Sequence, residues 1–410
     1  MLNLEHVYGA ITYDLAHRDD VDRYLEGRRR EADTHDRRHV MLARCSIRSV
    51  GDPYDPFVRG RFPVGVRTIH ARDTARHRLF PCEIWYPAAA QHHGQDVAPE
   101  TQDVFALPAG ERPRRQMAVR NGAARPGTYP LIVFSHASMS HRRMATFLCT
   151  HLSSHGYVVA ALDHSEVVAP ELARQDDENP EQTTARLEAV IATRVPDIRF
   201  LLDELLSGAT EGSNTTLDPT RVGIVGHSFG GWTALAAPEV EPRIRAVVAH
   251  APGGSSKPKP GILPATLTFK WARDVPTLYL VAENDVSLPL TGMYELFDRT
   301  PATKHMVILR QADHAHFMDD VEEMHETVRH MRFTGDLAWL PKDMRPIGEL
   351  CSGEQAHVFA RGLTLCHMDA TLKGEDQAQR FLAGDVKTEL AARGVDVIVH
   401  TSGHDRWTFT

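Results

Sequence analysis

The chain has 410 residues, of which 42% are hydrophobic and 24% are charged, and its formal net charge is −8. These values are ordinary for a globular protein and exclude a wholly disordered or collagen-like chain. An acidic chain lacks the basic face that nucleic-acid binding usually requires, so we expect no nucleic-acid partner. The longest apolar runs have the length of a strand, far short of the ~20 residues of a membrane-spanning helix, so we expect no membrane partner.

The N-terminal region is rich in charged residues, and a charged surface helix is expected within residues 14–40. The first twenty residues contain no basic segment leading into an apolar one, which a secretory signal would show. The five cysteines are sparse and form no CxxC pair, which favours reduced thiols packed as small hydrophobic residues. We therefore expect a cytoplasmic protein.

Strand patterns recur along most of the chain from residue 64 onward. Each is a short apolar or alternating run, which is typical of a β-strand. The segments expected to be strands are 64–69, 82–86, 131–134, 156–162, 221–225, 244–249, 277–281 and 305–309. The segment 395–399 has a similar apolar pattern, whereas 87–127 is expected to be a long loop.

Helical patterns alternate with these strands, which is typical of βαβ units and a parallel sheet covered on both faces. Proline is common at the first position of a helix, so Pro196 is expected to begin one. The segments with a helical pattern are 143–155, 181–194, 196–206, 230–237, 315–332, 353–372 and 375–393. We expect an α/β fold with a mostly parallel eight-stranded sheet, helices on both faces and a helical C-terminal region.

Three parts of the chain follow from these patterns. We expect an N-terminal extension at residues 1–60, the α/β core at residues 61–335 and a helical region packed on that core at residues 336–410. No internal repeat divides the core further.

The most specific motif is a G-x-S-x-G sequence at residues 226–230, with Ser228 at its centre. It directly follows the strand 221–225 and opens a helix, as a nucleophile elbow requires. The glycines permit a sharp turn in which a Cβ would collide with its neighbours. The start of the helix favours developing negative charge. We therefore predict that Ser228 is a nucleophile.

A serine hydroxyl needs a base, and in this kind of fold the acid and the histidine follow the serine in chain order. The loop after the strand 277–281 contains Asp285, which is the predicted acid, and Glu283, which is the alternative. The loop after the strand 305–309 contains His314 and His316. His314 is the predicted base because it comes first after the strand.

The sequence Asp-His-Ala-His at residues 313–316, which contains Asp313 and both histidines, also resembles a metal-binding cluster. No second cluster with ligand spacing accompanies it. Because the chain contains 24 histidines, an H-x-H sequence is expected to occur by chance. We therefore predict no metal site, and the serine mechanism itself requires no cofactor.

The tetrahedral intermediate of an acyl transfer needs two N–H donors. The first is expected from the backbone of Phe229, directly after the nucleophile. The second is expected from the loop 135–140, which follows the strand 131–134.

Five further side chains are candidates for substrate contact. Met139 and Val286 lie beside predicted catalytic positions, and His227 and Trp232 flank the elbow. His164 ends a strand at the same edge of the sheet. A role in the core is the competing interpretation for Trp232, and a structural hydrogen bond is the competing interpretation for His164.

Several of these segments resemble the serine α/β-hydrolases of the dienelactone-hydrolase-like and platelet-activating-factor-acetylhydrolase-like group. The resemblance is carried by residues 129–136, 155–159 and 226–231, and it covers about residues 62–335. Residues 282–289 also resemble the acid loop of bacterial cutinases. The pattern H-x-x-F from His314 is similar to the surroundings of the catalytic histidine in the acetylhydrolases. The resemblance implies an α/β-hydrolase fold.

The chain departs from this family at three places. The family usually has His-Gly where this chain has a histidine and Ala137, and the resemblance then puts the second N–H donor at Ser138. True dienelactone hydrolases use a cysteine, so Ser228 favours ester chemistry. The acetylhydrolases can place their acid after the preceding strand, but residues 250–254 contain no carboxylate, which returns that role to Asp285.

Together these observations predict a serine hydrolase that cleaves a small-molecule carboxylic ester through an acyl-enzyme. A cutinase-like hydrolase of polyesters or bulky aromatic diesters is an alternative, against which the lack of a secretory signal counts. A non-catalytic binding protein with this fold is an alternative of another class, and metal-dependent hydrolysis is a third.

Overall fold

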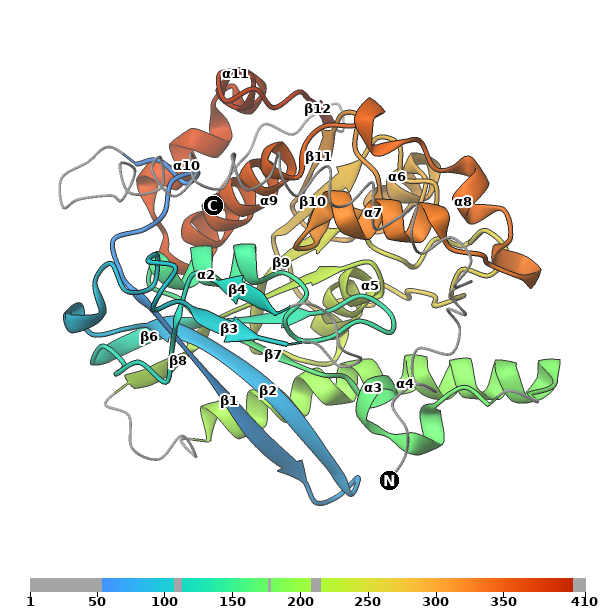
Figure 1. The fold of residues 1–410 in the computed structure, drawn as a ribbon, viewed down its shortest axis with the longest axis horizontal. Coiled ribbons are helices and arrows are strands. Elements are labelled where there is room, and N and C mark those ends of the chain that lie inside the picture. The colour runs from blue at the N-terminus through green and yellow to red at the C-terminus, as the bar shows by residue number, and fades with distance from the viewer. Residues whose placement is uncertain (1–53, 107–112, 176–177, 208–214, 401–410) are drawn as a thin grey trace.

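The structure is a computed structural model, and it describes residues 54–106, 113–175, 178–207 and 215–400. The charged helix expected within residues 14–40 lies outside these ranges. Figure 1 shows the described chain wound around one large sheet, with the N-terminal strands at one end of the sheet and the C-terminal elements at the other.

A ten-stranded sheet forms the centre of the molecule. Its strands are β1 (Val64–Asp73), β2 (Arg78–Pro87), β5 (Val119–Arg120), β6 (Gly127–Ser135), β7 (Val158–Leu162), β8 (Thr215–His227), β9 (Ile244–His250), β10 (Thr277–Ala282), β11 (Lys304–Leu309) and β12 (Val397–His400). The order across the sheet is β12-β11-β10-β9-β8-β6-β7-β2-β1-β5. Neighbouring strands from β7 to β11 are parallel, β2 is antiparallel to both of its neighbours, and β12 is antiparallel to β11.

The mostly parallel α/β sheet expected from the sequence is confirmed. All eight expected strands are present, and β5 and β12 extend the sheet at its two edges. The segment 395–399 therefore contributes a strand that the count of eight did not include.

Part of the segment 87–127, expected to be one long loop, contains short strands. Besides β5 these are β3 (Asp103–Phe105) and β4 (Arg114–Gln116), which pair with each other. Buried polar contacts hold the region, because Gln116 Nε2 donates to Asp103 and Trp85 Nε1 donates to Gln116 Oε1, each at 2.6 Å. Such strands have no hydrophobic period of their own, so the sequence pattern does not reveal them.

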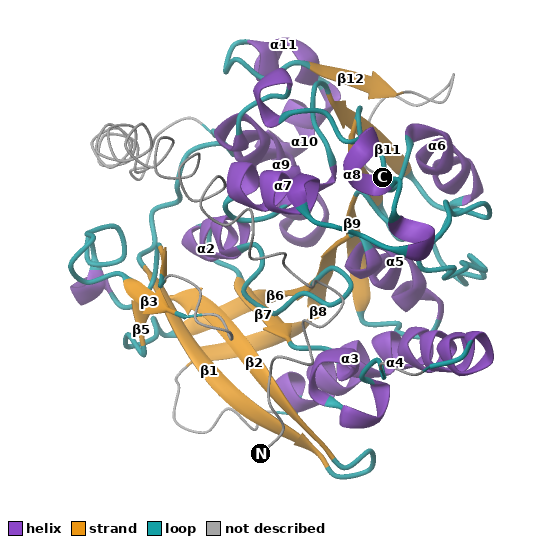
Figure 2. Ribbon diagram, turned by 45° about the vertical axis from the view of Figure 1, so that its right-hand side comes forward, coloured by secondary structure: helices purple, strands orange, loops and turns teal. Residues whose placement is uncertain are grey.

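Helices cover both faces of the sheet, as expected (Figure 2). They are α2 (Thr146–Ser154), α3 (Ser165–Val168), α4 (Pro180–Leu206), α5 (Phe229–Ala236), α6 (Leu290–Arg299), α7 (Val321–His330), α8 (Leu340–Asp343), α9 (Gly353–Met368), α10 (Asp376–Ala383) and α11 (Val386–Ala391). Buried side chains such as Ile198, Leu235 and Phe297 join α4, α5 and α6 to one face. Leu148 and Phe359 join α2 and α9 to the other.

The remaining helical elements of the described residues are short turns. The 3₁₀ turns are Ala90–His92, Pro170–Leu172, Ala237–Glu239, His314–Phe317, Gly335–Leu337 and Ile347–Glu349, and a π-helical turn, Asp369–Lys373, continues α9. The expected helix 315–332 is therefore a 3₁₀ turn followed by α7. Asp320 separates the two with a left-handed backbone, at φ 51°.

Helix α4 is continuous, whereas the sequence pattern predicted two helices divided at Pro196. Proline removes one backbone hydrogen bond from a helix interior and normally kinks or ends it. Here the side chains of Arg194 and Asp197, on either side of the proline, are bound to buried partners in the segment 164–166. These tertiary contacts hold both halves of the helix in place, so the prediction of two helices was wrong.

The chain after residue 335 packs on the same core as the sheet. Phe359 of α9 belongs to one buried cluster with Phe134 of β6, and β12 pairs with β11. The expected helix 375–393 is divided into α10 and α11, because the backbone at Gly384 is extended. The division of the chain at residues 60 and 335 stays a prediction.

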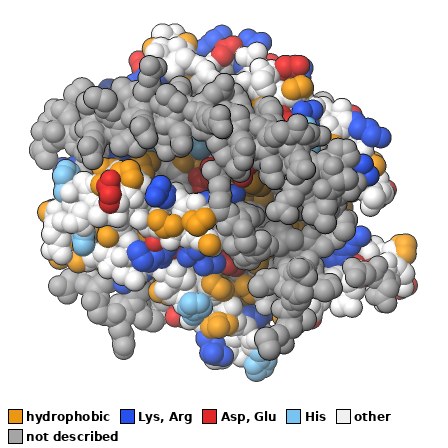
Figure 3. All heavy atoms as spheres, viewed as in Figure 1, with side chains coloured by type: hydrophobic (Ala, Val, Ile, Leu, Met, Phe, Trp, Pro, Cys, Tyr) orange, Lys and Arg blue, Asp and Glu red, His pale blue; other side chains and the backbone are white. Residues whose placement is uncertain are grey.

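The surface of the described residues is mixed in character. In Figure 3 hydrophobic, basic and acidic side chains are interspersed over the part of this face that is not grey. No helix in the described ranges is both long enough and apolar enough to span a membrane. The four described cysteines, Cys82, Cys149, Cys351 and Cys366, are free.

Candidate active site

Ser228 lies in a sharp turn between β8 and α5. Its backbone has φ 59° and ψ −117°, a strained conformation for a residue with a side chain. The backbone N–H of Ser228 donates to His250 O at 3.0 Å. A Cβ on Gly226 would lie 2.0 Å from Gly230 O, and a Cβ on Gly230 would lie 1.9 Å from Ser135 O. The two glycines are therefore required by close backbone contacts, as the motif predicted.

Asp285 and His314 are joined at the carboxyl edge of the sheet. Asp285 follows β10 and His314 follows β11, and His314 Nδ1 lies 2.7 Å from Asp285 Oδ2. Asp285 Oδ1 accepts from the backbone N–H groups of Ser287 and Leu288, at 2.9 and 2.8 Å. The buried carboxylate is thus fixed on both oxygens. It holds the imidazole with its hydrogen on Nδ1, which leaves the lone pair of Nε2 free for a proton.

The electrostatic surroundings raise the pKa of His314. Burial by itself would lower this pKa, but the charge of Asp285, its hydrogen bond to the ring and the charge of Asp313 outweigh burial. The ring is still 24% exposed, so it remains accessible at the surface of the site. A histidine with this environment is a stronger base than an isolated imidazole.

The structure separates the predicted residues from their alternatives. Glu283 accepts from the backbone N–H of Gln311 at 3.0 Å and pairs with Arg310 at 3.4 Å, away from His314. His316 is fully buried, where Nδ1 accepts from the N–H of Asp313 and Nε2 lies 3.1 Å from Cys351 O. Burial lowers the pKa of His316 to about 4. Its two ring nitrogens are engaged with the backbone, so the two histidines do not converge on one point.

Asp313 has a role in the site that the sequence analysis did not assign to it, since there it belonged only to a possible metal-binding cluster. Its Oδ1 accepts from the backbone N–H of His314 at 2.7 Å and from that of Val286 at 3.3 Å. It thereby connects the loop of the acid with the loop of the histidine. Burial, followed by the charge of Asp285, raises the pKa of Asp313. An acidic residue directly before the predicted base was the available signal.

Ser228 lies beside this pair rather than bound to it. The ring of its neighbour His227 lies 4.6 Å from the ring of His314, centroid to centroid. Among the hydrogen bonds of the described residues, none joins Ser228 Oγ to His314. Such contacts are often long in a free enzyme and shorten when substrate binds.

The two predicted N–H donors lie on segments that pack closely together. Phe229 is the first residue of α5, where a backbone N–H has no partner within the helix. The loop after β6 contacts the start of this helix, since a Cβ on Gly230 would collide with Ser135 O. Ser138 lies three residues farther along this loop and is exposed.

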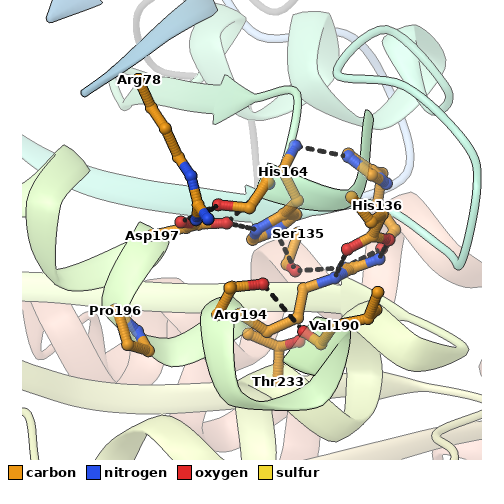
Figure 4. A network of polar contacts seen from close by, with 12 residues as sticks. Arg78, Ser135, His136, His164, Val190, Arg194, Pro196, Asp197 and Thr233 are labelled. Carbon is orange, nitrogen blue, oxygen red and sulfur yellow. Dashed lines mark hydrogen bonds and ion pairs between the residues drawn. The ribbon is translucent and has the colours of Figure 1, made fainter. Parts of the chain in front are cut away.

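Three predicted substrate contacts are buried. His164 is fully buried, with Nε2 2.9 Å from Ser135 Oγ and Nδ1 3.1 Å from Asp197, so it has no free atom for a substrate (Figure 4). His227 is also fully buried. Trp232 is 6% exposed, and its Nε1 donates to Thr266 O at 2.9 Å. The geometry therefore favours the structural hydrogen bond for His164 over a substrate contact, and all three side chains are buried.

The other two candidates remain at the surface. Met139 is 49% exposed and has a positive φ of 54°, which is uncommon for a residue with a side chain. Val286 is half-buried beside Asp285. Their contact with a substrate stays a prediction.

A hollow that the sequence did not indicate borders the acid loop. Its lining combines apolar side chains that include Leu263, Leu288 and Met293 with polar ones that include Lys257 and Ser287. Its lining begins at Gly254, next to the residue whose N–H donates to Ser228 O at 2.9 Å. The hollow therefore begins one residue from a backbone contact of Ser228.

Asp285→Asn tests the role of the acid. The side-chain amide would hold the imidazole in the wrong tautomer, so we expect a folded variant with kcat lower by about 10⁴-fold. His314 acts as a base only when it is deprotonated, and its pKa is raised. Wild-type kcat/KM should therefore fall on acidification with an apparent pKa above ~6.5. Asp285→Asn lacks the carboxylate charge, so the fall of kcat/KM at acidic pH, the acidic limb of the profile, should move to lower pH. Stopped-time assays from pH 5 to 9 measure both effects.

Glu283→Gln is the matched control, because it removes a carboxylate from the same loop. Its partners Gln311 and Arg310 lie outside the Asp285–His314 pair, so kcat and the acidic limb should stay close to those of the wild type. A large loss in Glu283→Gln together with an active Asp285→Asn would show that the acid was assigned to the wrong residue.

Comparison with known proteins gives consistent similarities. The family model described as "Platelet-activating factor acetylhydrolase, isoform II" matches residues 104–195. A platelet-activating factor acetylhydrolase of Gallus gallus is 25% identical over 218 residues, which cover 42% of this chain and 52% of that protein. Cutinase est1 of Thermobifida alba is 23% identical over 240 residues, which cover 57% and 68%. The chain spans about half the length of the acetylhydrolases that it matches.

A solved structure described as a ferulic acid esterase from Streptomyces cinnamoneus has the same fold. The TM-score is 0.51 with 23% sequence identity, and the match covers 80% of this chain and 93% of the esterase. The chain therefore has the α/β-hydrolase fold, and its sequence is similar to the acetylhydrolases and the cutinases.

Proposed function

We propose that this chain, an α/β-hydrolase similar to platelet-activating factor acetylhydrolases and bacterial cutinases, is a serine hydrolase of carboxylic esters. The observation that carries the proposal is the Asp285–His314 pair, with its 2.7 Å contact and its fixed carboxylate. This pair lies next to a serine in a strained strand-to-helix turn. A base that is oriented by a buried acid and adjoins such a serine is the arrangement that activates a hydroxyl nucleophile.

The mechanism follows from these positions. Ser228 attacks the ester carbonyl while His314 Nε2 takes the hydroxyl proton, and Asp285 stabilises the imidazolium. The N–H groups of Phe229 and Ser138 receive the oxyanion, and each such donor is typically worth about 10²–10³ in kcat. His314 then protonates the leaving alcohol. A water molecule, activated by the same histidine, releases the acid.

The substrate class is a small-molecule carboxylic ester. The similarity to acetylhydrolases and cutinases supports this class. The serine mechanism needs neither a metal nor a cofactor. We place the protein in the cytoplasm, a proposal that the free cysteines of the described ranges support.

Labelling with a fluorophosphonate tests the proposal. We expect a covalent adduct on the peptide that contains Ser228, together with turnover of p-nitrophenyl esters that chelators do not abolish. A folded protein that takes no label and hydrolyses no ester would instead support a non-catalytic binding role. Loss of turnover on chelation would support metal-dependent hydrolysis.

A cutinase-like hydrolase of polyesters or bulky diesters is the second candidate. The match to Cutinase est1, which extends over 57% of this chain, favours it. A panel of p-nitrophenyl esters of increasing chain length, extended to aromatic diesters, separates the two candidates. Rates highest on short esters support a small-molecule esterase, whereas rates highest on bulky aromatic diesters support the cutinase-like function.

A further inference from the structure

We propose that Arg194, from the middle of α4, is a positioning residue that orients both N–H donors of the oxyanion hole. The inference rests on the proposed function, because an oxyanion exists only if Ser228 attacks an ester. Arg194 is fully buried, although an arginine is almost never fully buried unless it is paired. The mechanism described above does not use it.

The guanidinium of Arg194 holds the backbone of the loop after β6. Nη1 donates to His136 O at 2.7 Å, and Nη2 donates to Ala137 O at 3.2 Å. The carbonyl of Ala137 belongs to the same peptide group as the N–H of Ser138, and the two point in opposite directions in a trans peptide. Fixing the direction of this carbonyl therefore fixes the direction of the predicted donor.

The same side chain contacts the residue that carries the other donor. Arg194 Cζ lies 4.2 Å from the centre of the Phe229 ring, an arrangement that is favourable for a cation. The N–H groups of Phe229 and Ser138 come from the start of α5 and from the loop after β6, and Arg194 contacts the ring of Phe229 and the carbonyl of Ala137. One buried side chain thus connects the two halves of the oxyanion hole.

Glu166 balances the charge of Arg194. Arg194 Nε donates to Glu166 Oε2 at 2.8 Å, and Arg194 Nη2 contacts Glu166 Oε1, so the pair is bidentate and both side chains are fully buried. A bidentate pair holds the plane of the guanidinium, because the planar fork matches the carboxylate. The remaining N–H groups are then directed at the loop.

A second set of buried groups supports the loop from its other side (Figure 4). His136 Nδ1 lies 2.7 Å from Ala137 O, and His136 Nε2 accepts from the N–H of His164 at 3.0 Å. Burial, followed by the charge of Arg194, lowers the pKa of both His136 and His164, so each ring is neutral. Ala137 O therefore contacts Arg194 and His136, and it also accepts from the backbone N–H of Ser140 at 3.2 Å. Donation by a cation to a peptide carbonyl also polarises the N–H on the other side of that peptide.

The relative rates with an ester and its thionoester provide a readout that would not change if Arg194 had only a structural role. Attack on a thionoester puts the negative charge on sulfur, which accepts hydrogen bonds weakly, so its rate depends less on the two N–H donors. The experiment compares kcat and KM for a p-nitrophenyl ester with those for the thionoester that has the same acyl group. The ratio of the two kcat/KM values, oxygen to sulfur, reports on the oxyanion hole alone.

Arg194→Lys keeps the charge but lacks the planar fork that reaches two carbonyls. We expect kcat for the oxygen ester to fall by about 10–100-fold with little change in KM, and the oxygen-to-sulfur ratio to fall by at least about tenfold. The double variant Arg194→Met/Glu166→Gln removes both buried charges, so no uncompensated charge remains in the core. It should show the same fall in the ratio.

Ile198→Ala is the matched control, because Ile198 is fully buried one turn farther along the same helix and belongs to the hydrophobic core. It should lower Tm and leave the ratio unchanged. An unchanged ratio in both Arg194 variants, or an equal fall in Ile198→Ala, would overturn the inference. A wild type that is not labelled at Ser228 would overturn the proposed function and this inference with it, so the two failures are distinguishable.

Discussion

Ser228→Ala is expected to remove essentially all ester turnover, with a fall in kcat on the order of 10⁶-fold. The reason is that no other group of the site can form the acyl-enzyme, so only binding and the oxyanion hole remain. The alanine keeps a Cβ in the same strained turn, and Ser228 Oγ makes no hydrogen bond in the described structure, so Tm should be close to that of the wild type. Initial rates and thermal unfolding measure these two quantities on the same sample.

The chain also contains a second arrangement of serine, histidine and aspartate. Ser135 Oγ lies 2.9 Å from His164 Nε2, and His164 Nδ1 lies 3.1 Å from Asp197. All three side chains are fully buried, so a fluorophosphonate cannot reach Ser135. Mass spectrometry should find the adduct on the peptide of Ser228 and none on that of Ser135. An adduct on Ser135, or full activity in Ser228→Ala, would contradict the assignment.

His314→Ala and His316→Ala are expected to differ strongly, although the two residues are only two positions apart. His314→Ala should abolish turnover of both p-nitrophenyl acetate and a longer ester, with a loss of up to about 10⁶-fold in kcat. His316→Ala should leave kcat within about tenfold, a barrier change of roughly 1.4 kcal/mol or less. The physical reason is that only His314 contacts Asp285, whereas His316 holds the backbone at Asp313 and Cys351.

The loss of thermal stability in these two variants should follow the opposite order to the loss of kcat. His316 is fully buried and bonded through both ring nitrogens, whereas the His314 ring is 24% exposed, so His316→Ala should lower Tm more. kcat is therefore measured per folded molecule, with the folded fraction taken from circular dichroism. Equal and near-complete losses of kcat in both variants would contradict the loop geometry and would reopen the metal-site interpretation.

The local features of this protein could be predicted from its sequence because neighbouring residues determine them. Short apolar or alternating runs bounded by turn residues are typical of strands, and all eight segments expected on this basis are strands of the sheet. The glycines around Ser228 specify a tight strand-to-helix turn in the same way, and the structure has that turn. Chain order then brought Asp285 and His314 to the same edge of the sheet, since parallel strands end there together. Their catalytic roles stay predictions.

The tertiary structure decided what depends on contacts between distant residues. The sequence favoured Asp285 over Glu283 in the same loop without excluding Glu283, and the packing of two loops shows that Asp285 is the one that contacts His314. Helix α4 continues through Pro196 because partners about thirty residues away hold both of its halves. Arg194 has no sequence signal at all. Its charge is stabilised in the core by Glu166 and by backbone carbonyls nearly sixty residues earlier, and no local pattern encodes a contact of that range.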